Sequence, residues 1–262
     1  MDLQLAGKRA FVSGSTAGIG YAIAEALSKE GTRVVINGRT KARVDQAVAK
    51  LQAAVGEVHG VVADLGTAEG VRETLTHFPD IDILVNNLGI FEPKPFEQIT
   101  DKDWLRFFEV NIMSGVRLSR HYLPRMKQNN WGRIIFVSSE SALQIPAEMI
   151  HYGMTKTAQL AIARGLAETT AGTGVTVNSV LPGPTASEGV AQFVEDIAAS
   201  KNASRADVER DFFEHTRPTS LLKRFETPEE IASVVAFLAS PLSSSINGTA
   251  VRADGGVVRS IA

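Results

Sequence analysis

Seven short runs of β-branched and apolar residues, separated by longer helical patterns, constrain this chain of 262 residues more than any other feature. The runs are nearly unbroken in hydrophobicity, which is typical of strands covered on both faces. The repeated strand–helix–strand order predicts a doubly wound α/β fold, with a parallel seven-stranded sheet, right-handed crossovers and helices on both faces. The predicted strands are Arg9–Ser13, Arg33–Asn37, Val58–Ala63, Ile83–Asn86, Arg133–Ser138, Val175–Val180 and Ala250–Arg252.

The stretches between the predicted strands carry apolar residues at helical spacing. Ile19–Glu30, Lys41–Ala54 and Asp103–Met126 are predicted helices, and Gly31 ends the first of them. No linker, low-complexity segment or repeat interrupts the alternation. We therefore expect a single domain over residues 1–262.

Residues 184–228 depart from this alternation. They contain two amphipathic pieces, Val190–Ala199 and Ala206–His215, and no predicted strand. Insertions of this length in a compact fold tend to be lids or binding loops, so we interpret the segment as a substrate-loop insertion. The alternative is a helical hairpin that only covers one end of the sheet.

Composition excludes several classes of function. Lys and Arg number 27 against 29 Asp and Glu, a net charge of −2 without a basic run, which argues against nucleic acid or an anionic membrane as partner. The absence of Cys rules out disulfides, thiolate catalysis and Cys-ligated metals, and the five His lack the spacing of a metal site. No signal-peptide pattern or long apolar run is present, so we expect a cytoplasmic protein.

A glycine-rich turn joins the first predicted strand to the first predicted helix. It reads Ser13-Gly14-Ser15-Thr16-Ala17-Gly18-Ile19-Gly20, with the spacing G-x-x-x-G-x-G instead of the broader dinucleotide fingerprint G-x-G-x-x-G. Glycines let the backbone approach a pyrophosphate, and free N–H groups at a helix start attract phosphates. The sequence therefore predicts a dinucleotide cofactor. The cofactor-binding residues predicted in this turn are Gly14, Ser15, Thr16, Gly18, Ile19 and Gly20.

The end of the second predicted strand bears on which dinucleotide is bound. An NAD-dependent enzyme usually places Asp or Glu there to hold the ribose 2′-hydroxyl, but this chain has Gly38 followed by Arg39. A guanidinium can grip a 2′-phosphate with two parallel hydrogen bonds. We therefore predict NADP(H) as the preferred cofactor, with NAD(H) as the alternative, and Arg39 as the residue that selects it. Comparable catalytic efficiency with NADH and NADPH would contradict this prediction.

Two further strand ends supply candidate cofactor contacts. Asp64-Leu65 ends the third predicted strand, and Asn86-Asn87-Leu88-Gly89 ends the fourth. Ligands of open α/β sheets bind at this edge, so Asp64, Leu65, Asn87 and Gly89 are predicted to contact the cofactor. The alternative is ordinary turn chemistry, with Asp capping a helix and the Asn-rich turn reversing the chain.

A tyrosine, a lysine and a serine provide the candidate chemistry. Tyr152 and Lys156 are four residues apart, hence neighbours on one face of a predicted helix, and Ser139 lies just after the preceding strand. Forming a phenolate at pH 7 costs roughly 4 kcal/mol, and an ammonium about 4 Å away offsets a cost of that order. Tyr152 is thus predicted to act as acid in carbonyl reduction and as base in alcohol oxidation, while Ser139 hydrogen-bonds the substrate oxygen.

With these residues in place, the chain resembles the short-chain dehydrogenase/reductase family, in the subgroup with TGxxxGIG, NNxG and YxxxK-type motifs. The resemblance implies a Rossmann-like fold and a catalytic tetrad of Asn111, Ser139, Tyr152 and Lys156, in which Asn111 holds a water in a proton relay to Lys156. From the residues alone, Asn111 is a polar residue inside a predicted helix. The matching positions extend over essentially the whole chain: the glycine-rich turn, Asp64, Asn86–Gly89, Asn111, Ser139, Tyr152, Lys156, Pro182-Gly183 and Asp254-Gly255-Gly256.

The resemblance also implies further cofactor contacts and an assembly. Tyr152 and Lys156 are expected at the nicotinamide ribose and Asn87 on the adenosine side, whereas Pro182, Gly183 and Thr185 are expected at the carboxamide. The family is usually oligomeric, so we expect a homotetramer or a homodimer. In this chain an apolar tail, with Val257, Val258 and Ile261, and the Ala- and Leu-rich helix Ala158–Ala167 support that expectation.

Three departures from the family pattern are notable. Ser13 replaces a common Thr but keeps the hydroxyl, and Leu88 replaces a common Ala, which predicts added bulk near the nicotinamide pocket. Glu140 follows the catalytic serine and His151 precedes the tyrosine. Each of these two either contacts a polar substrate or is a solvated loop residue.

The function predicted from the sequence is an NAD(P)(H)-dependent oxidoreductase acting on a secondary alcohol or ketone. One alternative is a 3-oxoacyl-thioester reductase, which would need a basic surface near the site; Arg217, Lys223 and Arg224 are the nearby candidates, and we interpret them as a solvated loop face. A catalytically silent nucleotide-binding regulatory protein is the remote alternative. The substrate is expected to be a mainly hydrophobic small ketone. Its predicted pocket is lined by Leu88, Ile90, Phe91, Gln144, Ile145, Met149 and residues 186–221.

Overall fold

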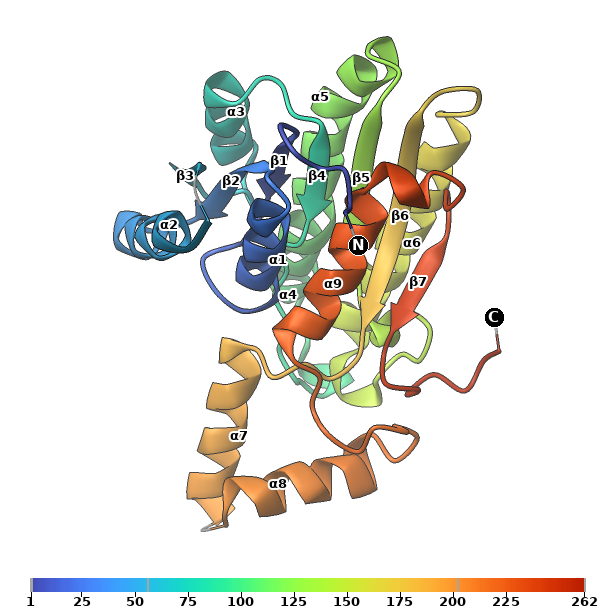
Figure 1. Ribbon diagram of the computed structural model, residues 1–262. Helices are drawn as coiled ribbons and strands as arrows, with labels where there is room; N and C mark the ends of the chain where they lie inside the picture. Colours follow the sequence, from blue (N-terminus) through green and yellow to red (C-terminus); the bar gives the residue numbers. More distant parts are fainter. Residues whose placement is uncertain (1, 56, 202, 262) are drawn as a thin grey trace.

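A parallel seven-stranded sheet forms the centre of the molecule, in the order β3-β2-β1-β4-β5-β6-β7 (Figure 1). The computed structural model describes residues 2–55, 57–201 and 203–261. The predicted doubly wound fold is confirmed, and the boundaries of the predicted strands differ from those observed by at most two residues. The strands are β1 (Arg9–Val12), β2 (Arg33–Gly38), β3 (Val58–Val62), β4 (Ile83–Asn86), β5 (Gly132–Val137), β6 (Val175–Pro182) and β7 (Ala250–Ala253).

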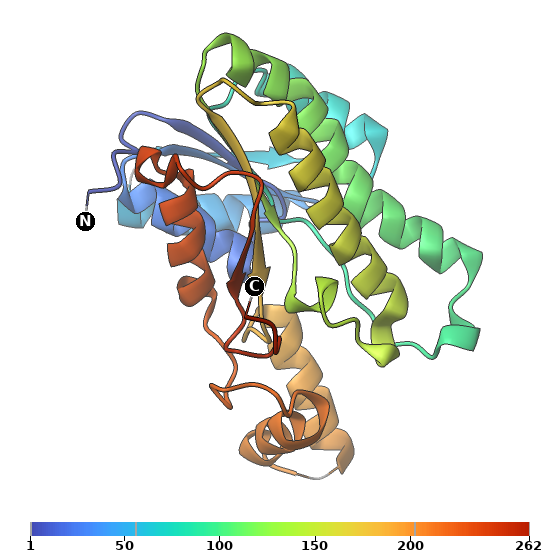
Figure 2. The ribbon, with the colours of Figure 1, turned by 90° about the vertical axis from the view of Figure 1, so that its right-hand side faces the viewer.

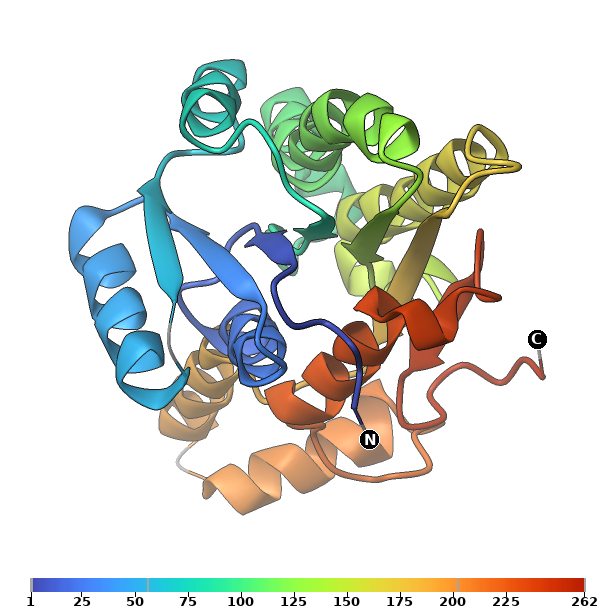
Figure 3. The same cartoon turned by 45° about the horizontal axis from the view of Figure 1, so that its top comes forward.

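Helices cover both faces of the sheet (Figure 3). One face packs against α1, α2 and α9, and the other against α3, α5 and α6. No helix in the described part of the chain is both long and apolar enough to cross a membrane. The helices are α1 (Gly18–Lys29), α2 (Lys41–Val55), α3 (Ala68–His77), α4 (Asp101–Phe107), α5 (Ser114–Gln128), α6 (Ile150–Glu168), α7 (Glu188–Lys201), α8 (Arg205–Asp211) and α9 (Pro228–Ala239).

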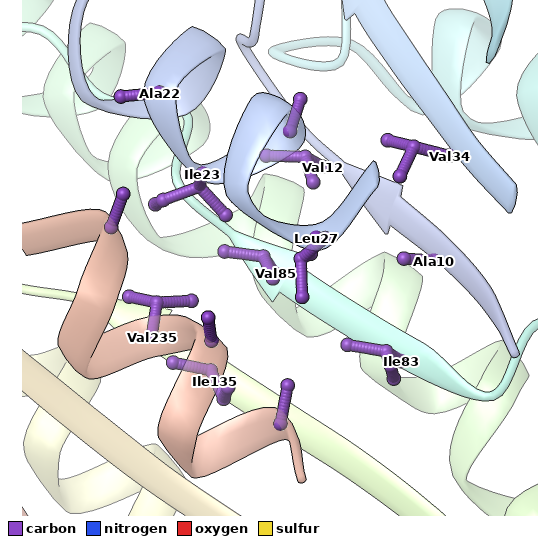
Figure 4. Packing of buried hydrophobic residues seen from close by; sticks show 14 of the residues in the cluster. Ala10, Val12, Ala22, Ile23, Leu27, Val34, Ile83, Val85, Ile135 and Val235 are labelled. Carbon is purple, nitrogen blue, oxygen red and sulfur yellow. The ribbon is translucent and has the colours of Figure 1, made fainter. Parts of the chain in front are cut away.

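The strand side chains divide between two cores. Val12 belongs to the core under α1 and α9, whereas its neighbour Phe11 belongs to the opposite core, because successive residues of a strand face opposite ways. Figure 4 shows the first core, where Ile23 and Leu27 of α1 meet Val235 of α9 above the strands. Burial of each such side chain stabilises the fold by about 1.5–3 kcal/mol. This packing fixes the start of α1 beside the end of β1.

The long helix predicted over Asp103–Met126 is wrong as a continuous α-helix. A π-helical segment, Phe108–Met113, separates α4 from α5. The segment is stabilised from outside, because the carbonyl oxygen of Asn111 accepts a hydrogen bond of 2.6 Å from the Gln159 side chain of α6. Such one-turn interruptions are frequent at functional sites.

The insertion lies beyond the carboxyl ends of the strands, where α7 and α8 project away from the sheet (Figures 1 and 2). Both predicted amphipathic pieces are helical, and the second continues as a π-helical segment, Phe212–Thr216. A short parallel pairing closes the base of the insertion, since Thr185 pairs with Glu226. The segment is therefore anchored at both of its ends next to the carboxyl edge of the sheet.

Candidate active site

The glycine-rich turn lies between β1 and the start of α1. Gly14 and Gly18 have φ angles of 61° and 56°, which residues with a Cβ rarely adopt. A Cβ on Gly20 would come within 2.5 Å of the Gly14 carbonyl oxygen and of Asn87 Nδ2. Ala17 precedes α1 and provides no side-chain cap, which leaves backbone N–H groups of the first turn for phosphates.

Ser15 braces the turn from inside. Its side chain is fully buried, its hydroxyl donates to the Val12 carbonyl at 2.6 Å, and its N–H donates to the Asn37 carbonyl at 2.9 Å. Asn37 Oδ1 also accepts a hydrogen bond from the Gly14 N–H at 3.2 Å. Sequence reasoning missed Asn37, because only the pairing of β1 with β2 brings it to the turn.

The Asn-Asn-Leu-Gly turn after β4 is tied to the glycine-rich turn. The Ser13 hydroxyl oxygen accepts hydrogen bonds from the N–H groups of Asn87 (2.9 Å) and Leu88 (3.0 Å), which explains why the hydroxyl matters at this position. The Asn87 side chain donates to the carbonyls of Ser13 and Gly14. Leu88 lies against Gly14, at 3.2 Å from a Cβ built there, and is not among the cavity-lining residues. The expectation that Leu88 shapes the substrate pocket is therefore wrong.

The carboxyl ends of β2 and β3 lie beside the turn. Thr16 packs on Gly38, because a Cβ there would be 2.5 Å from Thr16 Cγ2. Arg39 follows directly, is exposed, and makes no ion pair with the described residues. Asp64 is exposed and its carboxylate accepts a hydrogen bond from a local N–H, whereas the side chain of Leu65 is buried in the second core. Leu65 thus offers only its backbone to a ligand.

Ser139, Tyr152 and Lys156 line one cavity of about 470 Å³ at the carboxyl edge of the sheet. Lys156 Nζ lies 5.6 Å from the centre of the Tyr152 ring and donates to the Val137 carbonyl at 3.0 Å. Ile19 of the glycine-rich turn lines the same cavity, together with Asn87, Gly89, Pro182, Gly183 and Thr185. Three of the four predicted catalytic residues and these six predicted cofactor residues thus line one cavity of ordinary ligand-binding size, whereas Asn111 and the other predicted cofactor residues do not line it.

Asn111 stands behind Lys156. Its side chain pairs with the backbone of Ile90, accepting from the N–H at 2.8 Å and donating to the carbonyl at 3.0 Å, and it also donates to the Thr155 hydroxyl. A Cβ built on Gly89 would lie 3.4 Å from Lys156 Nζ and 3.7 Å from Asn111 Oδ1. Asn111 and Lys156 thus flank the same point of the chain, Gly89.

Burial dominates the electrostatics of the site. It raises the pKa of Tyr152, and the Glu140 carboxylate raises it further, against smaller lowering effects of Ser139 and Arg217. Burial lowers the pKa of Lys156 to about 8, against an opposite effect of Glu140. Lys156 is expected to make the phenol more acidic, but desolvation of the phenolate outweighs the attractions around it, so the net shift of the Tyr152 pKa is upward.

A buried ion-pair cluster that sequence reasoning missed lies beside the catalytic serine. Glu140 and Arg217 are 6% and 9% exposed, and Arg217 Nε donates to Glu140 Oε1 at 3.2 Å. Arg217 also pairs with Glu148 at 3.1 Å. The prediction of a solvated loop face is therefore wrong for Arg217, and for Glu140 the solvated alternative is excluded. The two partners are 77 positions apart in the sequence, so no local pattern reveals the pair.

The other two basic residues of that loop are also engaged. Arg224 pairs with Glu230 at 2.8 Å, and Lys223 Nζ donates to the carbonyls of Phe213 and Pro218. These interactions leave no cluster of free cations in the described part of the insertion near the cavity. A basic platform for an acidic carrier is thus missing from these three positions.

His151 is fully buried and does not line the cavity. Its ring packs 4.0 Å from the Phe107 ring and 6.0 Å from the Trp104 ring, measured between centres. Neither ring nitrogen has a hydrogen-bond partner among the described residues, and burial lowers the pKa of the imidazole. Both roles considered for His151 are therefore wrong, since it is a buried residue of α6 that packs against α4.

The insertion completes the cavity. Its first residues approach the glycine-rich turn, since a Cβ on Gly18 would lie 3.3 Å from Ser187 Cβ, and the Thr185 hydroxyl donates to the Gly183 carbonyl at 2.9 Å. The expected pocket residues Ile90, Phe91 and Met149 line the cavity, together with part of residues 186–221. Gln144 and Ile145, which were also expected, are not among its lining residues.

Glu226 supports the base of the insertion and gives a pH-dependent prediction. Its buried carboxylate accepts a hydrogen bond from the Gly183 N–H at 3.0 Å, and burial, with Asp254 nearby, raises the pKa of Glu226 to about 7. The folded protein then holds a proton that the unfolded chain releases between about pH 4.5 and pH 7. Glu226 therefore lowers the free energy of unfolding as the pH rises from about 4.5 to about 7. Above about pH 7 its effect no longer changes with pH.

Glu226→Gln is expected to raise the free energy of unfolding by about 1–2 kcal/mol at pH 8 and to change it little at pH 5. The amide oxygen can still accept from Gly183, so the hydrogen bond is kept. Urea unfolding at the two pH values measures the effect. Glu230→Gln is the control of opposite sign, because the ion pair with Arg224 lowers the pKa of Glu230 to about 2. Equal destabilisation of Glu226→Gln at both pH values would contradict the assignment.

Comparison with known proteins agrees with this geometry. A family model described as enoyl-(acyl carrier protein) reductase matches residues 14–258. The chain is 52% identical to uncharacterized oxidoreductase YvaG of Bacillus subtilis over the whole of both chains. A solved structure named as a short chain dehydrogenase/reductase family protein is 32% identical, covers 98% of each chain and superposes with a TM-score of 0.85.

The chain belongs to the short-chain dehydrogenase/reductase family. The structure of L-sorbose reductase from Gluconobacter frateurii, solved with NADPH and L-sorbose, superposes on the present structure with a TM-score of 0.93. The two sequences are 29% identical, and the match covers the whole of both chains. The protein is thus an oxidoreductase with the fold of nicotinamide-dependent enzymes. Within the described residues, no group of three or more His, Asp or Glu side chains could hold a metal ion.

Proposed function

We propose that this protein is an NADP(H)-dependent carbonyl reductase or alcohol dehydrogenase acting on a small ketone or secondary alcohol. The observation that carries the proposal is that Ser139, Tyr152 and Lys156 line the same cavity as Ile19 and Gly89 of the two cofactor turns. The remote alternative, a silent regulatory protein, is disfavoured because no member of the tetrad is missing. We further propose one domain, with residues 184–228 as its substrate loop, and a cytoplasmic location.

The residues at the carboxyl edge fit a nicotinamide dinucleotide. The turn has an uncapped helix start, and at Gly20 it has no space for a Cβ. We assign the phosphates to this turn, the adenosine to Asp64, Leu65 and Asn87, and the nicotinamide end to Gly89, Tyr152, Lys156, Pro182, Gly183 and Thr185. When bound, the cofactor supplies or accepts the hydride.

The chain's own residues would handle the proton and the developing charge. Tyr152 keeps its proton at neutral pH, because its pKa is raised by burial, and can give it to a carbonyl oxygen during reduction. Ser139 would hydrogen-bond the same oxygen as negative charge develops on it. We assign to Asn111 the water that returns a proton toward Lys156, since both flank Gly89.

Arg39 is the residue we assign to the choice of NADP(H). It is exposed at the carboxyl end of β2, and no ion pair with the described residues competes for its guanidinium. Gly38, where a carboxylate would repel the 2′-phosphate, contributes no charge. The NADPH complex of the structurally similar L-sorbose reductase supports this choice.

A 3-oxoacyl-thioester reductase is the less favoured alternative. The family model's description refers to acyl carrier protein, but such a carrier is recognised by exposed cations. In this chain Arg217 is buried, and Arg224 and Lys223 are already engaged.

The experiment that tests the proposed function is a panel of ketones, aldehydes, ketoses and oxoacyl thioesters, followed by the absorbance of NADPH and of NADH. We expect turnover of small ketones with NADPH and weaker turnover with NADH. Reduction of oxoacyl thioesters alone would favour the alternative. No turnover of any carbonyl would contradict the proposal.

We also propose a homotetramer or a homodimer. Leu105 of α4 and Phe108 of the π-helical segment are 66% and 41% exposed and are three residues apart, so they share one face of the helix. The apolar tail gives less support than expected, since Val257 and Val258 are buried within their own chain. Analytical ultracentrifugation at micromolar concentration is expected to give a mass well above the 28.1 kDa of one chain, and Leu105→Glu is expected to lower it. A monomeric mass for the unaltered protein would refute the assembly.

A further inference from the structure

The wall of the cavity next to Ser139 has a feature that a simple ketone would not need. Phe91, Met149 and Val190 line the apolar part of the cavity, as expected for a small ketone, but Glu140 and Arg217 bring buried charge to the reacting end. Burying charged groups is costly unless they are paired and hydrogen-bonded. The hydrogen bonds that these two residues make therefore indicate what the site is built to receive.

The Glu140 carboxylate has a donor for each oxygen. Oε1 accepts from Arg217 Nε at 3.2 Å, and Oε2 accepts from the Ser141 N–H at 2.8 Å. Oε2 also accepts from the hydroxyl of Ser139. In this structure the catalytic serine thus donates its one hydroxyl proton to Glu140.

This arrangement conflicts with the role assigned to Ser139. A serine hydroxyl has one proton to donate, so Ser139 can bond the substrate oxygen only by releasing Glu140. Glu140 Oε2 would then lose its hydroxyl donor at a site that is 6% exposed. Leaving a buried carboxylate short of a donor is unfavourable, and more so than for a neutral group. A substrate that brings its own donor to Oε2 removes this penalty.

On the basis of the proposed carbonyl reductase function, we propose that the substrate is a neutral α-hydroxy ketone, or a vicinal diol in the oxidation direction. Its hydroxyl, on the carbon next to the carbonyl, donates to Glu140 and replaces the Ser139 hydroxyl. Ser139 is then free to donate to the carbonyl oxygen. Glu140 is thereby a specificity-determining residue, and Arg217, which holds Oε1, positions it.

Charge around the cavity indicates that this substrate is neutral. Arg217 is already paired with both Glu140 and Glu148, at 3.2 and 3.1 Å. Lys156 Nζ, the other cation that lines the cavity, donates to the Val137 carbonyl at 3.0 Å. An additional anionic group, such as a phosphate or carboxylate on the substrate, would therefore have to compete with the two carboxylates for Arg217. A hydroxyl, by contrast, can donate to a carboxylate oxygen.

Matched substrates test the proposal directly in the wild-type enzyme with NADPH. Hydroxyacetone and 2-butanone differ by OH against CH3 at the carbon next to the carbonyl, as do acetoin and 3-methyl-2-butanone. We expect kcat/KM to be about 10- to 100-fold higher for the hydroxylated member of each pair. Equal or better turnover of the deoxy members would overturn the inference while leaving the carbonyl reductase function intact.

Substitutions assign the preference to Glu140. In Glu140→Gln the ratio of kcat/KM between the hydroxylated and the deoxy substrate is expected to fall at least about 10-fold. A neutral amide oxygen accepts a weaker hydrogen bond than a carboxylate, both from Ser139 and from a substrate hydroxyl. The double variant Glu140→Gln/Arg217→Gln removes both charges together, leaves no lone buried arginine, and is expected to lose the preference equally. Glu148→Gln removes the partly exposed partner of Arg217 Nη1 but keeps the hydrogen bond from Arg217 Nε to Glu140, so it is expected to keep the preference. If it lost the preference as strongly, the effect would belong to Arg217 packing and the role of Glu140 would be overturned.

A binding measurement separates this inference from catalysis. 2,3-Butanediol cannot be oxidised by the enzyme–NADPH complex, so its affinity can be measured there by calorimetry. We expect it to bind wild type about 10-fold more tightly than Glu140→Gln. Equal affinities would overturn the inference even if no carbonyl were turned over and the proposed function had failed on its own test.

Discussion

Tyr152→Phe is expected to lower kcat for carbonyl reduction by about 10²- to 10⁴-fold, the usual contribution of a positioned general acid. The substitution removes only the phenol oxygen, and the ring can keep its edge contact with Phe91, 6.4 Å away between centres. Because Tyr152 is also assigned to the nicotinamide end of the cofactor, NADPH affinity, measured by fluorescence titration, is expected to fall by no more than about tenfold, the loss of one hydrogen bond.

Tyr122→Phe is the matched control for this prediction. Tyr122 is a fully buried tyrosine on α5, and its hydroxyl donates to the Phe78 carbonyl at 2.7 Å, away from the cavity lining. Losing that bond should lower the free energy of unfolding by about 1 kcal/mol while leaving kcat near wild type. If Tyr152→Phe kept wild-type turnover of every carbonyl, the acid–base assignment would be wrong.

Arg39→Ala is expected to lower kcat/KM with NADPH by about 10- to 100-fold, since hydrogen bonds from a charged donor to a phosphate contribute about 1.5–3 kcal/mol. With NADH, which has no 2′-phosphate, kcat/KM should change by no more than about threefold. Initial rates with both cofactors measure the ratio.

Arg33→Ala provides the control for general loss of positive charge. Arg33 begins β2, the strand that precedes Arg39, and makes an exposed contact of 3.8 Å with Glu57. It should leave the cofactor ratio unchanged. A wild-type enzyme that used NADH as well as NADPH, or an equal loss with both cofactors in Arg39→Ala, would remove Arg39 from the proposed site.

The fold could be predicted because parallel strands covered on both faces are rich in apolar residues at successive positions. Ile83–Asn86 is buried at every position and reads Ile-Leu-Val-Asn. Val175–Pro182 is also buried throughout, although it carries the polar residues Thr176, Asn178 and Ser179. The ends of the strands follow from the same pattern, so the residues that reach the carboxyl edge could be named in advance. Ser139, Tyr152 and Lys156 could be placed near one another because Ser139 follows the end of β5 and the other two residues lie near the start of the next long helix.

The features that could not be predicted depend on contacts between distant segments. The π-helical turn at Asn111 depends on a hydrogen bond from Gln159, and the pairing of Glu140 with Arg217 depends on how the insertion folds back over the cavity. Neither leaves a local pattern. The direction of the pKa shift of Tyr152 also escaped prediction, because it is set by burial, which the spacing of Tyr152 and Lys156 does not reveal.

Hydride transfer itself can be followed with NADPH that carries deuterium at both C4 positions. During reduction of acetoin or another ketone of the panel, the account predicts one deuterium on the new carbinol carbon of the product for each NADPH oxidised, as read by mass spectrometry and NMR. Oxidation of NADPH without deuterium in the alcohol would contradict the claim that this cavity brings a nicotinamide and a carbonyl carbon together.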